Sequence, residues 1–166
     1  MKRHTLAAFT LALLLPAYAF ANPVYPPDRT AGDVSVFVGA AGYGVEFEEF
    51  TPGAEVSTNV HLTPYLAVTA RTAVAVRDPV LWLPAVGGAR FQFPLGAATI
   101  ALSPTLGAFV AFGDDEIPSV GPALGMRTSY EFAFESGFSY GFDLGAEFLP
   151  SAGWLPGGAL KVGWEF

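Results

Sequence analysis

The sequence predicts an all-β protein, an eight-stranded antiparallel up-and-down transmembrane β-barrel spanning residues 33–166. Three observations predict this fold. Hydrophobic residues alternate with small or polar ones along much of the chain, and this is the period of a β-strand. The chain is 52% hydrophobic and 14% charged, whereas a typical soluble domain is about 25% charged. After residue 21, no apolar run approaches the roughly 18 residues that a membrane-spanning helix needs.

The first 21 residues have the pattern of an export signal. Residues 2–4 are basic, residues 6–15 are largely apolar, and Ala-Phe-Ala at 19–21 offers the small residues that signal peptidase accepts. The apolar segment is too short for a membrane anchor, so we expect cleavage before Asn22. The chain has no cysteine, which excludes disulfides, thiolate nucleophiles and lipid attachment to cysteine. Residues 22–32 contain three prolines and are expected to form an extended leader.

The remaining chain divides at Pro and Gly into eight alternating segments. Hydrophobic residues alternate with Glu55, Ser57, Asn59 and His61 in the second segment, and with Ser139, Gly141, Asp143, Gly145 and Glu147 in the seventh. No helical pattern remains outside the signal, which disfavours a βαβ fold. The expected strands are 33–46, 54–63, 66–77, 84–93, 98–112, 119–131, 137–148 and 157–166. Tight turns are expected at 63–65 and 94–96, and longer loops at 47–53, 78–83, 113–118 and 149–156.

Two prolines conflict with this strand assignment. Pro104 and Pro122 fall inside expected strands, although proline cannot donate a ladder hydrogen bond. We therefore expect β-bulges or offset strand starts at these positions, and the strand boundaries near them stay open.

The composition of the two strand faces predicts which one meets lipid. One face is mostly Gly, Ala, Ser and Thr, which suits the inside of a narrow barrel better than a soluble surface. The other is rich in Phe, Leu and Val, and a closed barrel can expose it to lipid because closure satisfies every backbone donor. The expected inward face holds four basic residues (Arg71, Arg90, Arg127, Lys161), four acidic residues (Glu55, Asp143, Glu147, Glu165), and Gln92, Asn59 and His61.

This balanced set of inward charges predicts mutual ion pairs, because a buried unpaired charge is costly. The functional alternative is a path for protons or ions along the same groups. Tyrosines and tryptophans are expected to form girdles near the strand ends, at the lipid interfaces. The candidates are Tyr25, Tyr43, Tyr65, Tyr130, Tyr140, Trp82, Trp154 and Trp164.

Together these features resemble the small eight-stranded outer-membrane barrels of the OmpA transmembrane-domain and OmpX-like type. The resemblance covers residues 33–166 and rests on the signal, the rhythm of eight strands, the turn Leu62-Thr-Pro-Tyr65 and the ending Leu160-Lys-Val-Gly-Trp-Glu-Phe166. It implies residence in outer-membrane lipid, and recognition of the terminal Phe166 by the outer-membrane assembly machinery. It also implies periplasmic termini and outward loops, which are shorter here than those of the adhesins in the class.

The sequence predicts no enzyme and no catalytic, cofactor or metal site. His61 is the sole histidine after the signal, and with no cysteine an ordinary zinc site is excluded. Neither a phosphate-binding loop nor a dinucleotide fingerprint is present. The enzyme alternative is a lipid-modifying barrel, which needs Ser, His61 and an acid on the lipid-facing outer rim. We expect His61 in the lumen instead.

The acidic loops leave the question of partners open. Net charge −7 disfavours nucleic acid, and the abundance of aromatic residues excludes disorder. We expect a structural or envelope-interaction role, with another envelope protein or a surface polymer as partner and no open pore. A narrow passage for small or apolar solutes is the other alternative. The candidate cation ligands are Glu46, Glu48, Glu49, Asp114, Asp115 and Glu116, for which ordinary solvated charge is the simpler interpretation.

Overall fold

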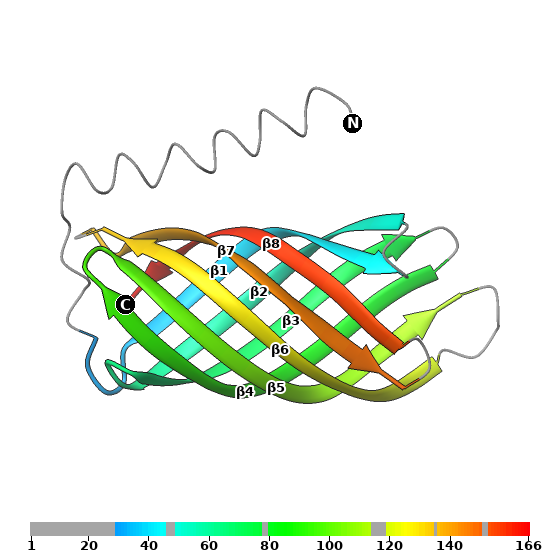
Figure 1. Ribbon diagram of the computed structural model, residues 1–166, viewed down its shortest axis with the longest axis horizontal. Helices are drawn as coiled ribbons and strands as arrows, with labels where there is room; N and C mark the ends of the chain where they lie inside the picture. Colours follow the sequence, from blue (N-terminus) through cyan, green and yellow to red (C-terminus); the bar gives the residue numbers. More distant parts are fainter. Residues whose placement is uncertain (1–28, 46–48, 78–79, 114–118, 135, 151–152) are drawn as a thin grey trace, which may run out of the picture.

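The computed structural model describes residues 29–45, 49–77, 80–113, 119–134, 136–150 and 153–166. Eight antiparallel strands form a closed barrel in which neighbours in sequence pair and β1 also pairs with β8 (Figure 1). The expected fold class is therefore confirmed. The strands are β1 (Val34–Val45), β2 (Glu49–Thr63), β3 (Leu66–Arg77), β4 (Val80–Leu95), β5 (Ala98–Phe112), β6 (Ser119–Ala133), β7 (Phe138–Leu149) and β8 (Gly153–Glu165).

The two ends of the barrel carry different parts of the chain. At the termini end, β1 begins and β8 ends, and backbone hydrogen bonds join Val34 to Phe166 in both directions. At the loop end, the odd-numbered strands end and the even-numbered strands begin. In the described part of the chain, no helix is long and apolar enough to cross a membrane.

Three strands begin earlier than the sequence predicts. β2, β4 and β8 start at Glu49, Val80 and Gly153, whereas starts at 54, 84 and 157 were expected. The expectation treated proline as a strand breaker, but Pro52 pairs with β1 and Pro156 pairs with β7. Pro52 lies one residue beyond the part of β2 that pairs with β3, and Pro156 lies one residue beyond the part of β8 that pairs with β1. A missing N–H group therefore removes no bond from that side.

The expected β-bulges at Pro104 and Pro122 are wrong. Both prolines lie within one unbroken β5–β6 register, Pro104 opposite Met126 and Pro122 opposite Ala108. On the β4 side, the ladder skips the pairs level with Pro104 and resumes in the same register. Pro122 precedes Leu124, where pairing with β7 begins. Each proline is therefore tolerated because one flank of its strand makes no ladder bond at that level.

The two faces of the barrel are divided as the alternation predicts. Most large apolar side chains point outward and are exposed, while the polar and charged side chains of the strands mostly point inward and are buried. This is the inverse of a soluble protein and the arrangement of a barrel surrounded by lipid. The exposed set includes Val38, Val56, Val68, Phe93, Leu106, Leu124, Leu144 and Leu160.

Glycine stands next to several of the large inward side chains. A Cβ atom added to Gly145 would lie 2.7 Å from Cγ of Arg127, and one added to Gly125 would lie 3.2 Å from Cγ of Glu147. These glycines give the long charged side chains the space to enter a lumen that is barely wide enough for them. The cross-strand pairs are Gly39 with Lys161, Gly125 with Glu147, Gly141 with Glu131 and Gly145 with Arg127.

We predict that Gly145→Ala destabilises the barrel by about 1–3 kcal/mol, the usual cost of overpacking. The added methyl group would press on Arg127 and on the backbone of β6. Urea unfolding in lipid vesicles, followed by tryptophan fluorescence, measures the change. Gly87→Ala is the matched control, because a Cβ there would meet only the Thr69 carbonyl oxygen at 3.4 Å. Equal unfolding free energies for the two variants would contradict the prediction.

Candidate functional site

The lumen collects the residues that the sequence singled out. All eight expected inward charges are buried there, together with His61, Gln92 and Asn59. Arg29 and Glu131 join them, so the described residues place five basic and five acidic side chains inside one barrel. The basic set is Arg29, Arg71, Arg90, Arg127 and Lys161; the acidic set is Glu55, Glu131, Asp143, Glu147 and Glu165.

Four of these side chains form a central quartet: Glu55, Arg71, Arg127 and Glu147. Arg127 Nη1 lies 3.1 Å from Glu55 Oε2, and Arg127 Nη2 lies 3.3 Å from Glu147 Oε1. Arg71 pairs with both carboxylates, 3.6 Å from Glu55 and in direct contact with Glu147. Both guanidinium groups also donate to the hydroxyl of Tyr43, at 3.2 and 3.4 Å. Charges of opposite sign therefore alternate around the quartet, so neither sign is left uncompensated.

A second group, the Glu131 cluster, consists of Arg90, Glu131, Asp143 and Lys161. Lys161 Nζ lies 2.6 Å from Glu131 Oε1 and 2.7 Å from Asp143 Oδ1. Arg90 Nη2 reaches the same Glu131 oxygen at 2.6 Å. The ammonium group of Lys161 also stands 4.6 Å from the ring centre of Phe37, in a cation–π contact. One carboxylate thus joins strands β4, β6 and β8 across the lumen.

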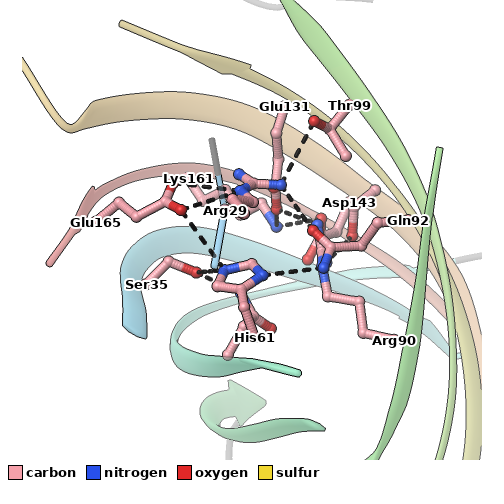
Figure 2. Close-up of polar contacts among 12 residues, drawn as sticks. Arg29, Ser35, His61, Arg90, Gln92, Thr99, Glu131, Asp143, Lys161 and Glu165 are labelled. Carbon is pink, nitrogen blue, oxygen red and sulfur yellow. Dashed lines mark hydrogen bonds and ion pairs between the residues drawn. The ribbon is translucent and has the colours of Figure 1, made fainter. Parts of the chain in front are cut away.

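The third group, the mouth cluster, lies at the termini end and includes Arg29, Ser35, His61, Gln92 and Glu165 (Figure 2). Gln92 Nε2 donates to His61 Nδ1 at 3.0 Å, so in the neutral ring the proton is on Nε2. That nitrogen faces Ser35 Oγ at 3.2 Å. His61, on β2, is therefore held by Ser35 on the adjacent strand β1 and by Gln92 on β4.

The position of His61 contradicts the lipid-modifying enzyme alternative. Its side chain is 1% exposed and lies in the lumen, not on the lipid-facing rim that this alternative requires. Ser35 and Glu165 also approach the same ring nitrogen, at 3.2 and 3.9 Å. A Ser–His–acid relay needs the serine and the acid on opposite ring nitrogens. Burial and geometry therefore both count against nucleophilic catalysis at His61.

A layer of apolar side chains, which we call the loop-end plug, lies beyond the central quartet. Its members are Tyr43, Trp82, Phe109, Leu149 and Leu155, and the space among them is a cavity of about 10 Å³. A cavity of that size holds about one water molecule. The lumen is thus packed with side chains at the loop end as well as at its centre.

The plug corrects part of the predicted aromatic girdle. Tyr43 is buried in the lumen, and Trp82 packs against the buried side chains there, so neither meets lipid. Tyr65, Trp154 and Trp164 are exposed, as girdle residues should be. Tyr130 and Tyr140 belong to a stack of rings on β6 and β7 together with Phe132 and Phe142. Tyr25 lies outside the described residues.

Two lumen charges were missed for different reasons. Glu131 continues the inward alternation of Arg127 and Ser129, and the expected strand ended at this residue, so extending the pattern would have found it. Arg29 belongs to the leader, which has no periodic pattern, and no sequence signal places it inside the barrel. Arg29 is 5% exposed and faces the lumen, whereas residues 22–28 of the expected extended leader lie outside the described residues.

The proposed cation ligands of the acidic loops lie outside the residues whose side chains are described. Within the described ranges, no group of three His, Cys, Asp or Glu side chains is placed to hold a metal ion.

We predict that Glu147→Gln destabilises the barrel by about 3–5 kcal/mol, because it leaves the two arginines of the quartet with one carboxylate between them. The double variant Glu147→Gln/Arg127→Gln restores the charge balance and should recover part of the loss. Urea unfolding in lipid vesicles measures the double variant and the two single variants, Glu147→Gln and Arg127→Gln. A double variant that loses the full sum of the two single effects would show that the charges are not coupled.

Comparison with known proteins identifies similar folds and no sequence relative. No family model and no curated sequence matches the chain. Neisserial surface protein A (NspA) aligns with a TM-score of 0.63 at 12% identity, over 82% of this chain and 96% of that one. The N-terminal β-barrel domain of Pseudomonas aeruginosa OprF gives 0.65 at 14% identity, over 83% and 100%. Ail, the attachment invasion locus protein of Yersinia pestis, gives 0.57 at 13%, over 82% and 100%. The chain thus has the fold of the small eight-stranded outer-membrane β-barrels, the type that its sequence resembles.

Proposed function

We propose that this chain is an outer-membrane β-barrel protein with a structural or envelope-interaction role and no open pore. The observation that carries the proposal is the contrast between the two surfaces of the barrel. The outer surface is apolar and exposed, which suits a lipid surround. Among the described residues, the lumen contains three groups of paired charges and the loop-end plug, and this filling supports a closed interior.

The proposed location rests on the sequence and on the similar structures. The basic, apolar and small-residue pattern of residues 1–21 supports export, and the fold supports insertion into the outer membrane. The names of two similar structures, a surface protein and an attachment invasion locus protein, support an interaction at the envelope surface. The partner we propose is another envelope protein or a surface polymer.

Two alternatives are less well supported. A lipid-modifying enzyme would need His61 on the outer rim, and His61 lies in the lumen. A passage for small or apolar solutes would need a continuous gap, whereas the cavity among the plug residues has room for about one water molecule.

We also propose that the side chain of Phe166 is recognised by the outer-membrane assembly machinery. It is 76% exposed, while the backbone of the same residue closes the barrel against Val34. Phe166→Ser keeps the backbone and removes the ring. It should reduce the amount of folded barrel in the outer-membrane fraction, where folded barrel is the form that migrates faster on a gel when the sample is not boiled. Phe93→Ser, at an exposed position within β4, is the control. Recovery of the native chain as a soluble periplasmic monomer would contradict the proposed location. An unchanged yield of folded barrel for Phe166→Ser would contradict the proposed role of Phe166.

We expect the reconstituted chain to conduct no more ionic current in a planar bilayer than the lipid alone. The reason is that, among the described residues, the side chains of the central quartet and of the loop-end plug occupy the lumen of a barrel that is narrow to begin with. A general porin reconstituted in parallel is the positive control. Reproducible current steps from the native chain would contradict the closed lumen and favour the passage alternative.

A further inference from the structure

Arg29 enters the lumen from outside the strands, at the termini end (Figure 2). Its Nε donates to Glu165 Oε1 at 3.1 Å and to Oε2 at 3.3 Å. Its Nη1 donates to Gln92 Oε1 at 2.6 Å and lies 3.5 Å from Thr99 Oγ1. Its Nη2 lies 3.9 Å from Glu131. One guanidinium group therefore contacts side chains from β4, β5, β6 and β8.

A short turn directs Arg29 back over the opening. Asp33 accepts hydrogen bonds from the backbone N–H of Thr30 at 2.6 Å and from its hydroxyl at 3.0 Å. Gly32 has φ of 102°, a conformation that glycine adopts without strain, and its N–H donates to the His61 carbonyl at 2.8 Å. The turn is thus fixed both to itself and to β2.

The Asp33 carboxylate supports this turn at neutral pH. The hydrogen bonds from Thr30 hold the pKa of the Asp33 carboxyl below its ordinary value of 3.8. A lowered pKa means that folding favours the carboxylate, so this contribution is present above the ordinary pKa and is lost as pH falls through the lowered one.

The residues around Arg29 match a guanidinium group in charge and shape. Glu165 has no other fixed positive partner among the described residues, since His61 is 3.9 Å away and charged only when protonated. Without Arg29, the described lumen would hold one more acidic than basic side chain. The acceptors are the carboxylate of Glu165, the amide oxygen of Gln92 and the hydroxyl of Thr99. They lie around the planar, forked set of N–H donors of a guanidinium group, a geometry that the ammonium group of lysine does not offer.

We propose that the opening at the termini end is a guanidinium-binding site, that Arg29 of the leader fills it, and that this docking closes the lumen at that end. Arg29 and the turn that follows it act as a latch that ties the segment before β1 to the last strand through Glu165. The proposal goes beyond the envelope role and does not depend on it, because the latch is a contact within the chain.

The absence of cysteine makes the latch directly measurable. A single Thr99→Cys substitution places a thiol beneath Arg29, at a site that is 3% exposed. In lipid vesicles, a charged membrane-impermeant thiol reagent should label this position slowly in the otherwise native chain. Adding Arg29→Gln should speed labelling roughly tenfold or more, the scale expected when charge-assisted hydrogen bonds are lost.

A second reporter separates an opened mouth from a loosened barrel. Ser57→Cys lies inside the barrel on β2, opposite Arg71, and should label at the same slow rate with or without Arg29→Gln. Equal acceleration at both reporters would overturn the latch in favour of general destabilisation. Rapid labelling at Thr99→Cys while Arg29 is intact would overturn it too, since the mouth would then be open.

Two further variants test the turn and the site. Gly32→Val strains the turn, because valine does not readily adopt the positive φ of Gly32. The new side chain does not touch Arg29, since nothing lies within 4 Å of an added Cβ. This variant should therefore also speed the labelling of the Thr99→Cys thiol. In the double variant Arg29→Ala/Thr99→Cys the site lacks its own guanidinium group. Millimolar guanidinium ion should then slow the labelling of the Thr99→Cys thiol, while tetramethylammonium at equal ionic strength should not. Equal protection by the two cations would reduce the effect to charge screening and overturn the binding site.

Discussion

The structure depends on the need to neutralise charge in a lumen that has little room for water. An eight-stranded barrel is just wide enough inside for side chains, so an ion placed there must find its counter-ion among its neighbours. The described lumen meets this need with equal numbers of basic and acidic groups, in three clusters along the barrel axis. The positions of the glycines, the hydroxyl of Tyr43 between two guanidinium groups and the entry of Arg29 all follow from it.

Filling the lumen in this way limits what the barrel can do. The ion pairs Arg71–Glu147 and Arg127–Glu55 tie opposite walls of the barrel together, and the loop-end plug adds a layer of apolar side chains. Transport along the axis would require moving several coupled side chains at once. The surfaces left for a partner are the lipid-facing side and the two ends of the barrel, and for this reason we propose an interaction role and not a conducting one.

Strand alternation predicted the fold and most of the lumen, because a closed barrel turns a local period of two directly into inside and outside. The same rule, applied further, would have placed Tyr43 and Glu131 inside, since both continue an inward series. Trp82 was assigned to a loop because Pro84 was taken to start the strand, although proline is tolerated where one flank is unpaired. Arg29 could not have been found this way. Its place depends on a turn and on partners that are distant in sequence.

The pairing of glycine with bulky charge across neighbouring strands has a consequence for how such a chain can change in evolution. The space that Arg127 occupies is left by Gly145 on the next strand, so a larger residue at one position is tolerated only with a smaller one at the other. Interior positions are therefore expected to vary in compensated pairs. The lipid-facing positions need only stay apolar and can be replaced one at a time. Barrels can then share one architecture at only 12–14% sequence identity, as this chain and the similar structures do.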